Sequence, residues 1–156
     1  MKYKRKHLKS YRGIDVSHRA IERNNERIVA INLNCRVRLE CANFCEKIWE
    51  QPSAYDAISC QFSIQYAFQS IETARRVIAQ ISASLKPDCC LIGTIPVHKE
   101  SPTFTQVVVK LPDDERECLE YSAHRQQLTS LCAECGLEEV IFQGFDEFYE
   151  MAKKKS

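Results

Sequence analysis

Short segments with strand-like and helix-like spacing of apolar residues alternate along this chain, and this alternation limits its fold more than any other feature. Tyr11 to Val16 is typical of a short strand, and Ser17 is placed to cap a helix that continues to about Ile31. The buried side of that helix is expected to hold Ala20, Ile21, Ile28 and Val29. Arg36 to Cys41 places Val37, Leu39 and Cys41 on one face, which predicts a half-buried strand. The pattern indicates an α/β layer architecture.

The alternation continues through the rest of the sequence. Tyr55 to Phe62 is apolar enough for a central strand buried on both faces, and Ser70 is a good N-cap for a helix that Pro87 ends. Further strands are expected over Cys89–Pro96, Val107–Val109 and Leu137–Phe142. Further helices are expected over Leu119–Leu131, with Gly136 as a left-handed C-terminal cap, and over Asp146–Lys155. We therefore expect an open, mostly parallel sheet with helices on both faces.

The size and composition of the chain fit a single domain over residues 1–156. Of its 156 residues 44% are hydrophobic and 28% charged, which supports a core and is too apolar for a disordered chain. The net charge of +1 does not by itself indicate nucleic acid. The first twelve residues, however, hold six basic side chains and no acid, which is typical of a solvated arm and less often of a phosphate-contacting patch.

Nine cysteines are many for a chain with neither the apolar stretch of a signal peptide nor the ~20 apolar residues of a membrane span. In a cytosolic or nuclear protein we expect such thiols to be small buried hydrophobic side chains. Cys132 and Cys135 have metal-like spacing but form a lone pair in a predicted helix. Cys35, Cys41 and Cys45 have no histidine at ligand spacing. We therefore predict no metal site and no redox role for the Cys132–Cys135 pair.

Polar and aromatic side chains follow three of the predicted strands. Asp15, Asn43 and the pair Gln61–Phe62 all fall at carboxyl ends, where open α/β sheets bind their ligands. An acidic residue there can accept hydrogen bonds from both hydroxyls of a ribose, and a side-chain amide can pair with an adenine edge. Strand ends also often carry Asp and Asn as helix caps, so the pattern alone leaves a binding site and a capping role open.

Several segments of this sequence resemble the mRNA cap guanine-N7 methyltransferase family. They are YDAISCQFSIQYAF at 55–68, LIGTIP at 91–96, GIDVS at 13–17 and EFYE at 147–150. The matching family segments run approximately FD-SCQF--HY-F and FIGTTP, and the match extends from about Lys2 to Glu150. The resemblance implies a class I methyltransferase sheet of Rossmann-like topology, S-adenosylmethionine as the cofactor, and methylation at N7 of the guanine cap of nuclear mRNA.

The resemblance also implies roles for individual residues. Asp15 matches the acidic residue that holds the cofactor ribose, and Asn43 falls where the family has an Asp that binds the adenine. Gln61 and Tyr66 match cofactor-lining positions.

On the substrate side, Phe62 matches an aromatic residue near the guanine, and Gln65 replaces a family His there. Arg27 lies where an arginine approaches the cap phosphates, and Glu120 matches a glutamate that binds the guanine edge. For each residue a structural role in the core, or as a solvated side chain, stays open.

The implied mechanism requires no general base, because guanine N7 is already a nucleophile and the sulfonium methyl is already activated. Catalysis then consists of aligning N7, the methyl carbon and sulfur in a suitable electrostatic environment. Capped mRNA would be the substrate, other capping-machinery proteins would be further partners, and the nucleus would be the location. No membrane partner is expected.

The sequence departs from the family in one large respect. The strand and glycine-rich loop that open the family's domain have no counterpart, since only Gly13, Gly93, Gly136 and Gly144 are present and none are grouped. We therefore expect a partial sheet, shortened at both ends, that lacks the first strand and the glycine-rich loop. The alternatives are a non-catalytic shortened paralogue that binds RNA or a capping partner, and a methyltransferase with a different acceptor.

Overall fold

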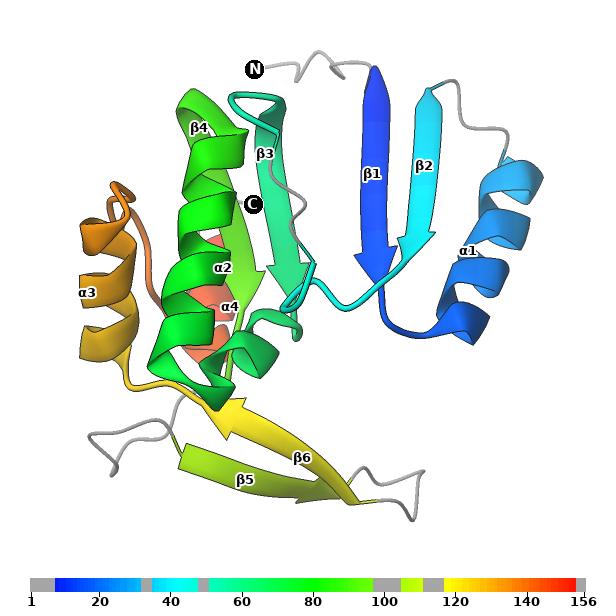
Figure 1. Cartoon of the computed structure of the whole chain (residues 1–156). Helices are drawn as coiled ribbons and strands as arrows, with labels where there is room; N and C mark the ends of the chain where they lie inside the picture. The colour runs from blue at the N-terminus through cyan, green and yellow to red at the C-terminus, as the bar shows by residue number, and fades with distance from the viewer. Residues whose placement is uncertain (1–7, 32–34, 48–50, 97–104, 111–116, 154–156) are drawn as a thin grey trace. The chain divides into compact units, whose positions relative to one another are not determined.

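The computed structural model describes residues 8–31, 35–47, 51–96, 105–110 and 117–153 (Figure 1). The chain divides into two compact units, residues 1–49 and residues 50–156, and each is described by itself. The basic residues among the first seven positions lie outside the described residues.

The first unit is a parallel strand–helix–strand arrangement. Strand β1 (Ser10–Asp15) is followed by helix α1 (His18–Ile31) and strand β2 (Arg36–Cys41), and the two strands pair from Ser10 opposite Arg36 to Asp15 opposite Cys41. These elements confirm the prediction for this part of the chain. The Ser17 hydroxyl accepts a hydrogen bond from the Ala20 amide at 3.2 Å, which confirms it as the cap of α1.

One detail of α1 was predicted wrongly. Val29 is 80% exposed, whereas Ala20, Ile21 and Ile28 are half-buried. Val29 follows Ala20 by nine positions, which rotates it about 180° around the helix and away from the buried side. An apolar residue adjacent in sequence to a buried one therefore does not share its face.

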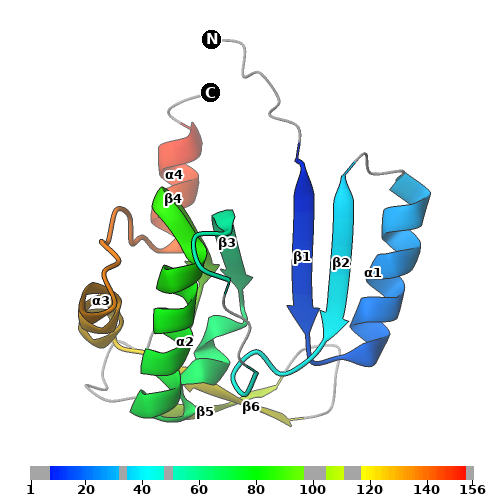
Figure 2. The ribbon, with the colours of Figure 1, turned by 45° about the horizontal axis from the view of Figure 1, so that its top comes forward.

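The second unit begins with another parallel pair. Strand β3 (Tyr55–Gln61) pairs with β4 (Leu85–Thr94), and the connection between them holds the 3₁₀ helix η1 (Ile64–Gln69) and helix α2 (Ile71–Ser84). Figures 1 and 2 show α2 and α4 (Phe145–Lys153) on opposite sides of this pair, as expected for helices on both faces.

The expectation that β3 is buried on both faces is wrong. Asp56, Ala57 and Ser59 are exposed, while Ile58 and Cys60 are half-buried. Among the described strands only β4 pairs with β3, so alternate side chains of β3 remain in contact with solvent.

The core of the second unit forms where η1 packs against α2. The Ser70 hydroxyl accepts a hydrogen bond from the Thr73 amide at 3.1 Å, which confirms the predicted cap of α2. The helix ends at Ser84, so Pro87 lies inside β4 rather than at the helix end. The buried apolar side chains described in this unit are Ile64, Ala67, Phe68, Ala74, Val77, Ile78, Ile81, Leu85, Ala123 and Leu131.

The C-terminal part of the chain corrects two predictions. The helix expected over Leu119–Leu131 is instead strand β6 (Glu117–Ser122) followed by helix α3 (Arg125–Glu134). Strand β5 (Thr105–Lys110) pairs antiparallel with β6, and this non-local pairing overrides the helical spacing of the apolar residues.

The second correction concerns Leu137–Phe142, where the structure has no strand. Val140 is 88% exposed, and no described strand pairs with this apolar run. Gly136, by contrast, has the predicted left-handed conformation, with φ of 80°, and the Leu137 amide bonds to the Cys132 carbonyl at 2.8 Å. Helix α4 confirms the last predicted helix.

Candidate functional site

The candidate site residues fall into two groups, one on each unit. The first unit holds Asp15, Arg27 and Asn43, and the second holds Gln61, Phe62, Gln65, Tyr66 and Glu120. Four of the candidates lie at the carboxyl ends of parallel strands, where this class of sheet binds ligands: Asp15, Asn43, Gln61 and Phe62.

Asp15 is the last residue of β1 and is exposed. Its Oδ1 accepts a hydrogen bond from the Ser17 amide at 2.8 Å, and its backbone carbonyl accepts one from the Ala42 amide at 2.9 Å. The first contact turns the chain from β1 into α1, so Asp15 has the local turn-forming role that the sequence left open. A carboxylate has about four acceptor sites, and the exposed group retains capacity for a ribose hydroxyl.

Asn43 lies two residues past β2, at the same edge of the sheet as Asp15. Its amide oxygen accepts a hydrogen bond from the Cys45 amide at 3.0 Å, and its Nδ2 donates to Glu46 at 2.8 Å. These contacts fix the orientation of the side chain. The oxygen has a second lone pair, so it fits one further donor such as an adenine amino group.

Arg27 lies apart from this edge. Helix α1 starts immediately after β1, and nine residues of helix extend about 13 Å, so Arg27 is displaced along the helix axis from the strand ends. Arg27 instead continues an exposed series with Arg19 and Arg23, each one turn from the next. Sequence analysis singled out only Arg27, although the spacing of four residues was the available signal for all three.

Phe62 directly follows β3 and has an unusual backbone. Its φ is 47°, in the left-handed region that a bulky side chain rarely adopts, at a cost of about 1–2 kcal/mol. Its amide donates to Thr94 Oγ1 at 2.8 Å, and its side chain is 59% exposed. The neighbouring Gln61 is exposed and donates from Nε2 to the Ser59 hydroxyl at 3.1 Å.

Gln65 and Tyr66 are consecutive residues of η1 with opposite environments. Tyr66 is 39% exposed, but Gln65 is completely buried, and neither its amide nitrogen nor its amide oxygen has a hydrogen-bond partner among the described residues. The structure therefore places Tyr66 at the surface and Gln65 in the interior of the second unit, so the predicted contact of Gln65 with the cap stays a prediction.

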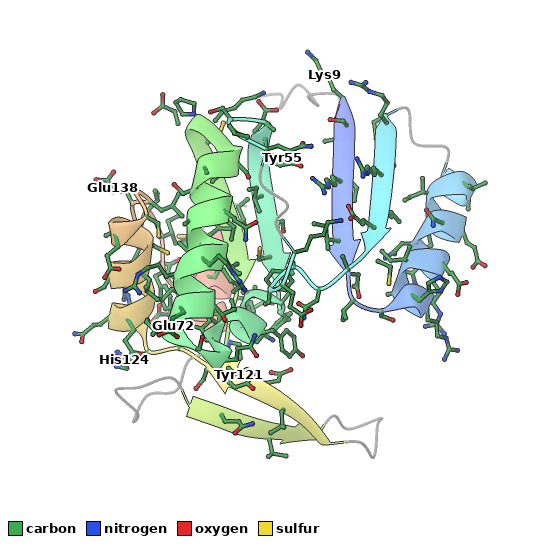
Figure 3. All side chains as sticks on the ribbon, in the orientation of Figure 1. Lys9, Tyr55, Glu72, Tyr121, His124 and Glu138 are labelled. Carbon is green, nitrogen blue, oxygen red and sulfur yellow. The ribbon has the colours of Figure 1, made fainter. Side chains whose placement is uncertain are left out.

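Glu120 is half-buried on β6, opposite Val107 of β5. Strand β6 contacts η1, so Glu120 and Tyr66 belong to adjacent elements. Figure 3 labels Tyr121, which follows Glu120 in β6. This places Glu120 on an element that packs against the segment following Phe62.

The eight cysteines whose burial the structure describes are less buried than predicted. Cys45 is buried, whereas Cys41 and Cys90 are exposed on strands whose outer sides are open in the described part of the chain. Burial raises the pKa of the Cys60 thiol to about 11. Burial also raises the pKa of Cys132 and of Cys135, which disfavours the reactive thiolate of that pair.

The described residues contain no group of three or more His, Cys, Asp or Glu side chains that could hold a metal ion. Within the same residues, no helix has the length and apolar character needed to span a membrane.

The sequence model of the mRNA (guanine-N(7))-methyltransferase domain matches residues 1–116. The chain belongs to this family. It is 40% identical over 63 residues to mRNA cap guanine-N(7) methyltransferase 1 of Arabidopsis thaliana, covering 38% of this chain and 17% of that protein. It is 33% identical over 104 residues to the mRNA cap guanine-N(7) methyltransferase of Eremothecium gossypii, covering 61% of this chain and 24% of that protein. The matched segments thus cover less than a quarter of the length of either relative.

The fold also resembles solved methyltransferase structures. CalS10, an amino pentose methyltransferase from Micromonospora echinaspora, superposes with a TM-score of 0.61 at 15% identity. The superposition covers 86% of this chain and 68% of CalS10. This similarity confirms the expected partial Rossmann-like class I methyltransferase fold.

Proposed function

We propose that this chain is part of an enzyme that transfers a methyl group from S-adenosylmethionine to N7 of the guanosine cap of mRNA. The observation that carries the proposal is that the family match over residues 1–116 includes both polar strand ends, Asp15 and Gln61–Phe62. Capped mRNA would be the substrate, and such an enzyme would act in the nucleus alongside other capping proteins.

The strand-end side chains fit parts of the cofactor. The exposed carboxylate of Asp15 would accept hydrogen bonds from the ribose, and the oriented amide oxygen of Asn43 would accept the adenine amino proton. Gln61 and Tyr66 are proposed as further cofactor-binding residues. When bound, S-adenosylmethionine supplies an activated methyl group.

The remaining candidates would bind the guanine rather than exchange protons with it. Glu120 would accept hydrogen bonds from the guanine N1 and amino protons, and its negative charge would favour the positively charged methylated ring. Phe62 would contact the base, and contacts of Gln65 with the cap and of Arg27 with the cap phosphates stay predictions from the family resemblance. The residues of this chain therefore orient and stabilise, and none is assigned as a general base.

The distribution of charge supports an RNA partner. Residues 1–49 contain twelve Lys and Arg against five Asp and Glu, whereas residues 50–156 contain ten against sixteen. The excess positive charge of the first unit suits the phosphate backbone of RNA. This observation also favours the second candidate function, a non-catalytic module that binds RNA, because it does not depend on methyl transfer.

Asp15 provides the test of the cofactor site. We expect Asp15→Ala to weaken binding of S-adenosylhomocysteine by ~1–3 kcal/mol, measured by calorimetry. Asp15→Ser retains a hydrogen-bond acceptor for the turn into α1, so it should keep the stability of the fold while losing affinity to the same extent. An unchanged dissociation constant in both variants would remove Asp15 from the site.

Activity separates the two candidate functions. The chain is incubated with labelled S-adenosylmethionine and a GpppA-capped RNA, and label at guanine N7 is expected. RNA binding with no transfer of label would instead support the non-catalytic module.

A further inference from the structure

We propose that Phe145 is a positioning residue that holds the ring of Phe62 as a stacking platform for a planar nucleobase. This inference rests on the proposed function, because the base would be the guanine of the cap. What is new is the role of Phe145, which lies at the start of α4, far from Phe62 in the sequence.

Phe62 combines two features that are unfavourable for stability alone. Its backbone is in the left-handed region, and the residue is 59% exposed to water. The strained backbone is held in place because the Phe62 amide donates to both Thr94 Oγ1 and the Thr94 carbonyl, at 2.8 and 3.3 Å. Strain that the surrounding structure enforces is characteristic of binding sites.

The ring of Phe145 contacts this platform. The two ring centroids are 6.1 Å apart and the ring planes are inclined by 42°, which is within the range of favourable aromatic pairs. Phe145 is itself 66% exposed, so the contact leaves part of both rings accessible. The pair restricts the orientation of Phe62 and still offers an aromatic surface on which a base can stack.

The segment before Phe145 is neither helix nor strand, but side-chain contacts attach it to α3. The Glu139 carboxylate accepts hydrogen bonds from Arg125 and, at 2.6 Å, from the Thr129 hydroxyl. The Arg125 guanidinium also lies 4.8 Å from the centre of the Phe142 ring. The hydrogen bonds from Arg125 and Thr129 lower the pKa of Glu139, so the carboxylate stays charged at neutral pH. These contacts tie the chain before α4 to α3.

The experiment compares three variants of the whole chain. Phe145→Ala removes the ring, Phe145→Tyr keeps it, and Phe148→Ala is a matched control. Phe148 is 53% exposed on the same helix and has no ring contact among the described residues. The measurements are the dissociation constant for GpppA, that for S-adenosylhomocysteine, and the nuclear Overhauser effect between the rings of Phe62 and Phe145.

We expect Phe145→Ala to raise the dissociation constant for GpppA about fivefold, with that for S-adenosylhomocysteine unchanged. Phe145→Tyr and Phe148→Ala should stay within about twofold of the wild type. Equal losses for both ligands would indicate general disruption of the fold and would overturn the positioning role.

Failure of the proposed function has a different signature. A wild-type chain with the ring contact but no affinity for GpppA would overturn cap binding, and with it the assignment of the base. Absence of the ring contact, or unchanged GpppA affinity in Phe145→Ala, would overturn the inference even if the wild type binds and methylates the cap.

Discussion

At the scale of single residues, the buried amide of Gln65 constrains the second unit most sharply. Its two polar atoms lie in the core formed by η1 and α2 and have no hydrogen-bond partner in the part of the chain that the structure describes. Leaving a buried donor or acceptor unsatisfied costs about 1–3 kcal/mol. In the family the matching position carries a His. The resemblance implies a contact of this side chain with the cap, which stays a prediction, and its burial in the core could not be derived from the sequence.

Replacing Gln65 by an apolar side chain of similar shape should therefore stabilise the protein. We expect Gln65→Met to increase the free energy of unfolding by about 1–2 kcal/mol, measured by urea denaturation, because the unsatisfied amide is removed. Gln69→Met, at an exposed position of the same 3₁₀ helix, should change it by less than about 0.5 kcal/mol. A loss of stability in Gln65→Met would contradict this account.

At the scale of elements, local sequence signals located most boundaries correctly. Ser17, Ser70 and Gly136 were recognised as caps because a cap acts through hydrogen bonds to residues three or four positions away. Strand β6 was missed because its pairing with β5 joins segments that the local pattern does not connect. The run Leu137–Phe142 was assigned as a strand from its apolar residues alone, but no described strand pairs with it. The same difference applies to the site, where the strand ends were predictable and the contact of Phe145 with Phe62 was not.

Two serines test the contribution of capping in matched positions. Ser70 precedes α2 and accepts a hydrogen bond from Thr73, whereas Ser63 precedes η1 and makes no side-chain cap. We expect Ser70→Ala to lower the free energy of unfolding by about 1 kcal/mol and Ser63→Ala to have little effect. Thermal or urea denaturation monitored by circular dichroism measures both. Equal losses would show that the cap contributes nothing specific.

At the scale of the whole molecule, the basic and acidic residues are distributed unequally between the two units, although the net charge is small. A chain with an overall charge of +1 contains one basic and one acidic unit. Sequence analysis noted the basic first twelve residues, but the extent of the basic region became visible only with the division at residue 49. The Arg19, Arg23 and Arg27 series adds exposed positive charge on α1, where Glu22 and Glu26 are the acidic neighbours.

The excess of basic residues in the first unit predicts how RNA binding depends on salt concentration. We expect the affinity for an uncapped single-stranded RNA to fall as the salt concentration rises. The triple variant Arg19→Gln/Arg23→Gln/Arg27→Gln should reduce the magnitude of the slope of log affinity against log salt concentration by up to about 2. Glu22→Gln/Glu26→Gln, on the same helix, should bind more tightly than the wild type. Fluorescence anisotropy measures both, and an unchanged slope in the arginine variant would exclude α1 from the RNA surface.

The strained backbone of Phe62 has a consequence for protein engineering. Glycine adopts a positive φ without steric cost, and the exposed ring of Phe62 contributes little buried area to the fold. A library selected for heat resistance alone would therefore enrich glycine at position 62 and discard the aromatic platform. Selection for thermal stability would favour glycine at this position, whereas selection for cap recognition would favour phenylalanine.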